Sequence, residues 1–172
     1  MLSRFEFKKS VIVIDPCYAI KDKDYYGIWG DKKTYNFKDG QVADMMFVMS
    51  TVVGDGCFPT EGIEEATEGL ESDKSLPVDS GTIAIINGAS ESVDYEALEK
   101  EYEMNYVKFD GDGYAIIDDS CVRKADSKLE SCYYITLCFD DGRMYEFKIV
   151  LWHENDEDIW DDCENEDEES ED

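Results

Sequence analysis

The sequence has a single histidine, His153, and none of its six cysteines forms a Cys-x-x-Cys pair. Structural zinc sites need clustered thiolate and imidazole ligands, usually in paired short spacings, so this class of site is not expected. The cysteines are expected to be reduced thiols that pack as small apolar side chains, at positions 17, 57, 121, 132, 138 and 163. The sequence therefore predicts no bound metal and no cofactor.

Long apolar runs are also missing. No stretch approaches the length of about 20 apolar residues that spans a bilayer, and residues 1–9 lack the apolar core of a secretory signal. A cytoplasmic protein with no membrane contact is the expectation.

Positive charge is scarce: 16 Lys and Arg stand against 43 Asp and Glu, a net charge of −27. Residues 154–172 hold 13 of the acids and no Lys or Arg, so residues 1–153 carry −14. Such a field repels nucleic acid and anionic membranes and attracts cations and basic proteins. Direct binding of nucleic acid is not expected, since the lysine pairs at 8–9 and 32–33 are isolated.

Strand patterns dominate the rest of the chain. The β-branched run Val11–Ile14 predicts a central strand covered on both faces. Residues 133–139 and 144–152 flank Asp-Asp-Gly-Arg and predict a C-terminal hairpin over 133–152. Only residues 93–105 read as a helix, capped by Ser92 or Asp94. The predicted class is α+β, with seven or eight mostly antiparallel strands and one main helix.

The domain organisation follows from composition. Residues 1–153 are predicted to form one globular domain, and the polar segment 21–40 is read as a long loop or irregular hairpin. Residues 154–172 are almost entirely acidic, and runs of like charge do not fold alone. This segment is predicted to be a largely disordered tail.

Asp15-Pro16-Cys17-Tyr18, which follows the central strand, is a candidate local site together with Asp79. A nucleophilic Cys17 needs a base, and His153 is the sole histidine. Asp15 can be read as a general base or metal ligand. In the alternative interpretation, Asp15 caps the turn while Tyr18 packs inward, and no residue is catalytic.

Two glycine-acid turns, 54–56 and 111–113, invite a calcium interpretation. The helix–loop–helix template needs an oxygen ligand at position 5 and glycine at position 6. Counted from Asp110, these positions hold Tyr114 and Ala115, so the template fails. Turn formation is the better interpretation of both motifs.

Three short pieces stand out together: Ile14-Asp15-Pro16-Cys17-Tyr18, Gly54-Asp55-Gly56-Cys57-Phe58-Pro59, and Val78-Asp79-Ser80-Gly81-Thr82-Ile83-Ala84. Their combination resembles small uncharacterised bacterial and phage proteins, among them the domain of unknown function numbered 4241. The resemblance covers residues 11–86 at the level of motifs. It implies a β-rich fold and a phage or mobile-element origin, a setting in which small acidic proteins often inhibit host-defence nucleases.

Three functions remain open. The first is an acidic, non-enzymatic binding protein that occupies the basic nucleic-acid channel of a partner enzyme, most specifically a phage-type anti-restriction or anti-CRISPR inhibitor. The second is a small enzyme or a ligand- or metal-binding domain centred on Asp15, Cys17 and Asp79. The third is a structural or regulatory module with a solubilising tail. The candidate partner-binding carboxylates are Asp110, Asp112, Asp118, Asp119, Glu154, Asp156, Glu157, Asp158, Asp161 and Asp162.

Overall fold

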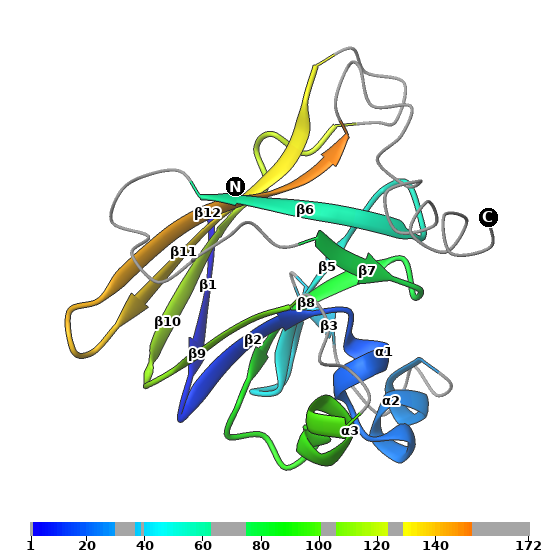
Figure 1. Ribbon diagram of the computed structural model, residues 1–172, viewed down its shortest axis with the longest axis vertical. Coiled ribbons are helices and arrows are strands. Elements are labelled where there is room, and N and C mark those ends of the chain that lie inside the picture. The colour runs from blue at the N-terminus through cyan, green and yellow to red at the C-terminus, as the bar shows by residue number, and fades with distance from the viewer. Residues whose placement is uncertain are drawn as a thin grey trace, which may run out of the picture.

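The computed structural model describes residues 2–29, 37–38, 40–62, 75–100, 106–123 and 129–152. Within these ranges the chain forms two six-stranded antiparallel sheets and three short helices, stacked as three layers (Figure 1). The strand-dominated α+β class is as predicted. Two details of that prediction are wrong: the described residues form twelve strands, not seven or eight, and three short helices replace one main helix.

The first sheet, sheet A, contains the C-terminal hairpin. Its strands, in spatial order, are β1 (Leu2–Phe7), β10 (Gly113–Asp118), β11 (Ser131–Phe139), β12 (Met144–Trp152), β6 (Gly56–Gly62) and β7 (Ser75–Val78). β11 and β12 pair through the turn at 140–143, where the Phe139 backbone nitrogen donates to the Arg143 carbonyl oxygen at 2.9 Å. Asp-Asp-Gly-Arg supplies the turn residues that such a tight connection favours.

The second sheet, sheet B, has the strand predicted to be central. Its order is β3 (Phe37–Lys38), β4 (Gln41–Val42), β5 (Met46–Ser50), β8 (Thr82–Asn87), β2 (Ser10–Ile14) and β9 (Val107–Asp110). β2 pairs with β8 on one side and β9 on the other, and all five of its residues are buried. The prediction of a strand covered on both faces is confirmed.

The helices cover the face of sheet B that points away from sheet A (Figure 1). They are α1 (Pro16–Ala19), α2 (Asp22–Trp29) and α3 (Tyr95–Lys100). Ala19 and Leu98 pack there with Ile12 and Ile14 of β2. None of the helices in the described ranges has the length and apolar character of a membrane-spanning segment.

α2 corrects part of the prediction for residues 21–40, a long loop or an irregular hairpin: Asp22–Trp29 is helical, whereas β3 and β4 pair antiparallel around residue 40. The polar sequence with Gly27 and Gly30 favours a loop rather than this helix. Asp22 and Asp24 stand in the first turn of α2, where negative charge is favourable to the helix dipole. α3 has its N-terminal hydrogen bond from Asp94, whose Oδ1 accepts from the Ala97 nitrogen at 3.0 Å. Residues 101–105 lie outside the described ranges.

A second core fills the space between the two sheets. Alternate residues of β11 and β12 point into it, which is why the two strands alternate between buried and partly exposed residues. Its members include Phe5, Phe7, Val11, Val13, Phe58, Ile135, Leu137, Tyr145, Phe147, Ile149 and Leu151. Sheet B is therefore buried on both faces, whereas the outer face of sheet A keeps partly exposed side chains such as Tyr114 and Tyr134.

Gly113 of β10 lies against the backbone of β11 with no room for a side chain. A Cβ atom at this position would lie 2.1 Å from the carbonyl oxygen of Cys138. Gly142, in the hairpin turn, is different: its φ is +96°, and no atom lies within 4 Å of a Cβ built there. Gly113 is required for space, whereas Gly142 is required for its backbone conformation.

We expect Gly113→Ala to lower the free energy of unfolding by about 2–3 kcal/mol, because the carbonyl it would strike belongs to the paired strand. Gly142→Ala should cost only about 1 kcal/mol, the strain of a left-handed alanine. Urea unfolding of both variants measures the difference. Equal stabilities would contradict the close approach.

Candidate functional site

Asp15 directly follows β2, and its carboxylate is fully buried and accepts four hydrogen bonds. Oδ1 accepts from the Cys17 nitrogen at 2.8 Å and from the Ser80 hydroxyl at 2.7 Å. Oδ2 accepts from the backbone nitrogens of Asp79 at 2.7 Å and Ser80 at 2.8 Å. A carboxylate has about four lone-pair positions, so the acceptor capacity of Asp15 is filled by the protein itself. These are the contacts of a helix cap and a turn anchor.

Three turns that are far apart in sequence meet around this carboxylate. Asp15 joins the turn at 15–18 to the turn at 79–81 through the bonds above. Buried Thr51 then joins the turn at 54–56: its nitrogen donates to the Gly81 carbonyl at 3.1 Å, and its hydroxyl donates to the Gly54 carbonyl at 2.6 Å. The structure thus brings together Asp15, Cys17 and Asp79, the predicted local site.

The Cys17 thiol is half-buried within this group. Burial raises its pKa, and the nearby carboxylates of Asp15, Asp79 and Asp55 raise it further. The thiol is therefore protonated at neutral pH, whereas a nucleophilic cysteine needs a populated thiolate. His153, the only candidate base, lies outside the described residues.

Tyr18 and Asp79 form the most direct side-chain contact of the group, with the Tyr18 phenol donating to Oδ2 of Asp79. Burial raises the pKa of Tyr18, and the bond to Asp79 adds to the effect. Sequence reasoning missed Ser80, although it sits beside Asp79 in the Val-Asp-Ser-Gly motif. We call Asp15, Cys17, Tyr18, Asp79 and Ser80 the Asp15 cluster. Across the described residues, no group of three or more His, Cys, Asp or Glu is placed to hold a metal ion.

The other cysteines divide into two kinds. Cys121, Cys132 and Cys138 are free thiols like Cys17, whereas Cys57 is disulfide-bonded. The expectation that the thiols are all reduced is therefore wrong for Cys57. Spacing along the chain does not encode which cysteines meet in space, so the sequence carried no signal for this bond.

The four predicted partner-binding carboxylates of the body do not form one patch. Asp110 and Asp112 precede β10, whereas Asp118 and Asp119 lie at its far end, and five residue steps of strand separate Gly113 from Asp118 by about 17 Å. Asp110 has Lys108 as an ion-pair partner at 3.7 Å. Asp112 accepts from the Lys9 backbone nitrogen at 2.7 Å and so anchors the turn between β1 and β2.

The six remaining candidates lie outside the described residues: Glu154, Asp156, Glu157, Asp158, Asp161 and Asp162. The described ranges contain 20 of the 43 acids and 11 of the 16 bases, so they carry −9 of the total −27. The layered body thus holds a real but moderate negative charge. Most of the net negative charge belongs to residues outside the described ranges.

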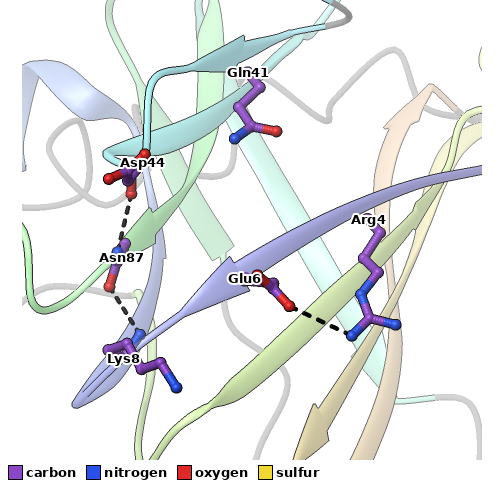
Figure 2. Close-up of a pocket in the computed structure, with 6 residues that line it drawn as sticks. All are labelled: Arg4, Glu6, Lys8, Gln41, Asp44 and Asn87. Atoms are coloured by element: carbon purple, nitrogen blue, oxygen red, sulfur yellow. Dashed lines mark hydrogen bonds and ion pairs between the residues drawn. The ribbon is translucent and has the colours of Figure 1, made fainter.

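A pocket of about 390 Å³ opens beside β1, the edge strand of sheet A (Figure 2). Asn87 joins its two sides: Oδ1 accepts from the Lys8 nitrogen at 2.9 Å, and Nδ2 donates to the Asp44 carbonyl at 2.9 Å. Arg4 and Glu6 form an ion pair at 3.5 Å along its rim. The lining consists of Arg4, Glu6, Lys8, Gln41, Asp44 and Asn87, and none of the predicted site residues belongs to it.

Comparisons with known proteins add no relative: no family model, no curated protein and no solved structure matches the chain. The candidate sites therefore stand on their geometry alone.

We expect Asp15→Ala to lower the free energy of unfolding by about 3 kcal/mol or more, because it removes a buried carboxylate and leaves the part-buried donors of Cys17, Asp79 and Ser80 unpaired. Asp55→Ala, at an exposed carboxylate of the neighbouring turn, should change it by less than about 0.5 kcal/mol. Urea unfolding at neutral pH compares the two. A loss no larger for Asp15→Ala than for the control would refute the anchoring role.

The raised pKa of Cys17 predicts slow alkylation. At pH 8 its thiolate fraction falls below that of an ordinary thiol, so iodoacetamide should label Cys17 at least about tenfold more slowly than an unstructured cysteine peptide added to the same sample. Peptide mass mapping after timed quenching measures both rates in one sample. Fast labelling of Cys17 at neutral pH would instead indicate a reactive thiolate.

Proposed function

We propose that this protein is a non-enzymatic binding protein that docks its acidic surface on a basic partner. The observation that carries the proposal is the charge: −9 on the described layers and −18 on the remaining residues. Carboxylates held on a folded body can occupy a channel of lysines and arginines and gain the counterion-release energy that nucleic acid gains there. A nucleic-acid enzyme is therefore the partner class that fits best.

The more specific version is a phage-type inhibitor of a restriction or RNA-guided nuclease. It draws on the motif resemblance to bacterial and phage proteins as well as on the charge. The inhibitor would compete with DNA or guide-bound nucleic acid for the same basic channel, so inhibition should be competitive and salt-sensitive.

The contacts of the Asp15 cluster favour this class over an enzyme. The Asp15 carboxylate is filled by four protein donors, the Asp79 carboxylate accepts from Tyr18, and the Cys17 thiol is protonated. These contacts join the turn at 15–18 to the turn at 79–81, fill the Asp15 carboxylate and leave the Cys17 thiol in its unreactive form. The remaining alternative, a structural module with a solubilising tail, differs from the proposal in how it responds to loss of residues 154–172.

A panel of purified restriction and RNA-guided nucleases tests the proposal. We expect at least one to be inhibited competitively with DNA, with an affinity that falls about 10- to 100-fold between about 50 and 300 mM salt. Calorimetry at each salt concentration measures the affinity, and a cleavage assay measures the competition. If no member of the panel binds the protein at low salt, the proposal is wrong.

Truncation before residue 154 completes the test. If residues 154–172 contribute to the contact, the truncated chain should bind the same nuclease more weakly. A truncated chain with unchanged affinity but lower solubility would assign this segment to the third function, a solubilising device.

A further inference from the structure

The outer face of sheet A is the sheet surface that the described helices leave open (Figure 1). It presents tyrosine, aliphatic and charged side chains, and it includes tyrosine, Met and Arg, which are residue types enriched at protein interfaces. Two of the large apolar side chains exposed in the described ranges belong to it, Leu2 at 68 % and Met144 at 41 %. The other members that bear on the argument are Arg4 and Glu6 on edge strand β1, and Tyr114, Asp118, Tyr134 and Lys148 on β10, β11 and β12.

One end of this face already shows how it holds a guanidinium group. Tyr114 of β10 lies directly opposite Glu6 of β1. The Arg4 guanidinium lies over the Tyr114 ring, 3.8 Å from its centroid, and its Nη2 is 3.5 Å from Oε1 of Glu6. The ring contributes its negative face and the carboxylate contributes its charge, so the pair recognises both the shape and the charge of arginine.

A second pair of a tyrosine and a carboxylate lies one strand further into the sheet. Tyr134 of β11 lies directly opposite Asp118 of β10, so a tyrosine again faces a carboxylate across neighbouring antiparallel strands. Both side chains are partly exposed. Among the described residues no cation lies over the Tyr134 ring, whereas Arg4 lies over Tyr114.

The surroundings of Tyr134 and Asp118 keep this position attractive to a cation. Hydrogen bonds from Ser120 lower the pKa of Asp118, and the charge of the N-terminal amino group lowers it slightly further, so the carboxylate stays ionised; it has further acceptor positions to offer. Lys148 lies opposite Tyr134 on the other side, but its ammonium is held by Glu130 at 2.6 Å and Glu61 at 3.3 Å. Its positive charge is thus compensated within the sheet.

We propose that Tyr134 and Asp118 form a subsite for an arginine side chain of a basic protein partner, with the guanidinium stacked on the ring and paired with the carboxylate. The inference rests on the proposed function, since it names where the acidic protein meets its partner. Exposed Leu2, opposite Asp118, adds apolar surface for the stem of that arginine. Arginine is preferred over lysine because only the planar guanidinium stacks and pairs at once.

Nona-arginine and nona-lysine peptides, titrated into the full chain at low salt, test the subsite. Tyr134→Leu should weaken nona-arginine binding about 3- to 10-fold, while nona-lysine should change less than twofold. Tyr134→Phe keeps the ring and should keep the affinity. Asp118→Asn should weaken nona-arginine more than Glu96→Gln, a matched loss of one charge on α3. Amide chemical-shift changes should centre on β10 and β11.

Equal losses for both peptides in Tyr134→Leu, or equal effects of Asp118→Asn and Glu96→Gln, would overturn the subsite and leave only general charge attraction. Urea unfolding of each variant excludes a folding defect, and Tyr134→Phe remains informative if Tyr134→Leu is unstable. The nuclease panel separates the two proposals. A nuclease that binds wild type and Tyr134→Leu equally refutes the subsite alone, whereas arginine-selective peptide binding without any nuclease binding refutes the proposed function alone.

Discussion

The fold depends on one buried carboxylate and the four donors that surround it. Asp15 ends the central strand β2, caps α1 and holds the backbone of residues 79 and 80, which lead into the neighbouring strand β8. A buried charge is tolerated only when hydrogen bonds replace the water it has lost, and here the protein supplies all of them. The Asp15-Pro16-Cys17-Tyr18 motif thus has a structural role, because its carboxylate links the turn at 15–18 to the turn at 79–81.

The two sheets differ in how many of their faces are covered. Sheet B is covered by sheet A on one face and by α1, α2 and α3 on the other, so its side chains are committed to two cores. Sheet A contributes one face to a core and leaves the other open. Tyrosines and carboxylates on that open face are partly exposed, which is why the proposed recognition site lies on sheet A, whereas the Asp15 cluster stabilises the fold.

Charge acts at two levels in this protein. The long-range field follows from the excess of 43 acids over 16 bases and favours any basic partner. Local pairs then decide which carboxylates are available: Asp110 is compensated by Lys108, and Asp112 anchors a turn, whereas Asp118 faces an aromatic ring with no cation over it among the described residues. Net charge alone does not distinguish these roles.

The sequence by itself determined the buried strand Val11–Ile14, the strand-dominated class and the acidic charge, because periodicity and composition are local or additive properties. It did not predict α2, whose polar, glycine-containing sequence favours a loop until tertiary contacts hold it. Nor did it show that Asp79 and Ser80 reach Asp15, or that Asp118 faces Tyr134, because these meetings depend on strand register across 64 and 16 residues of chain. Only the tertiary structure decides that the Asp15 carboxylate is filled by protein donors, because two of its three partner residues, Asp79 and Ser80, are distant in sequence.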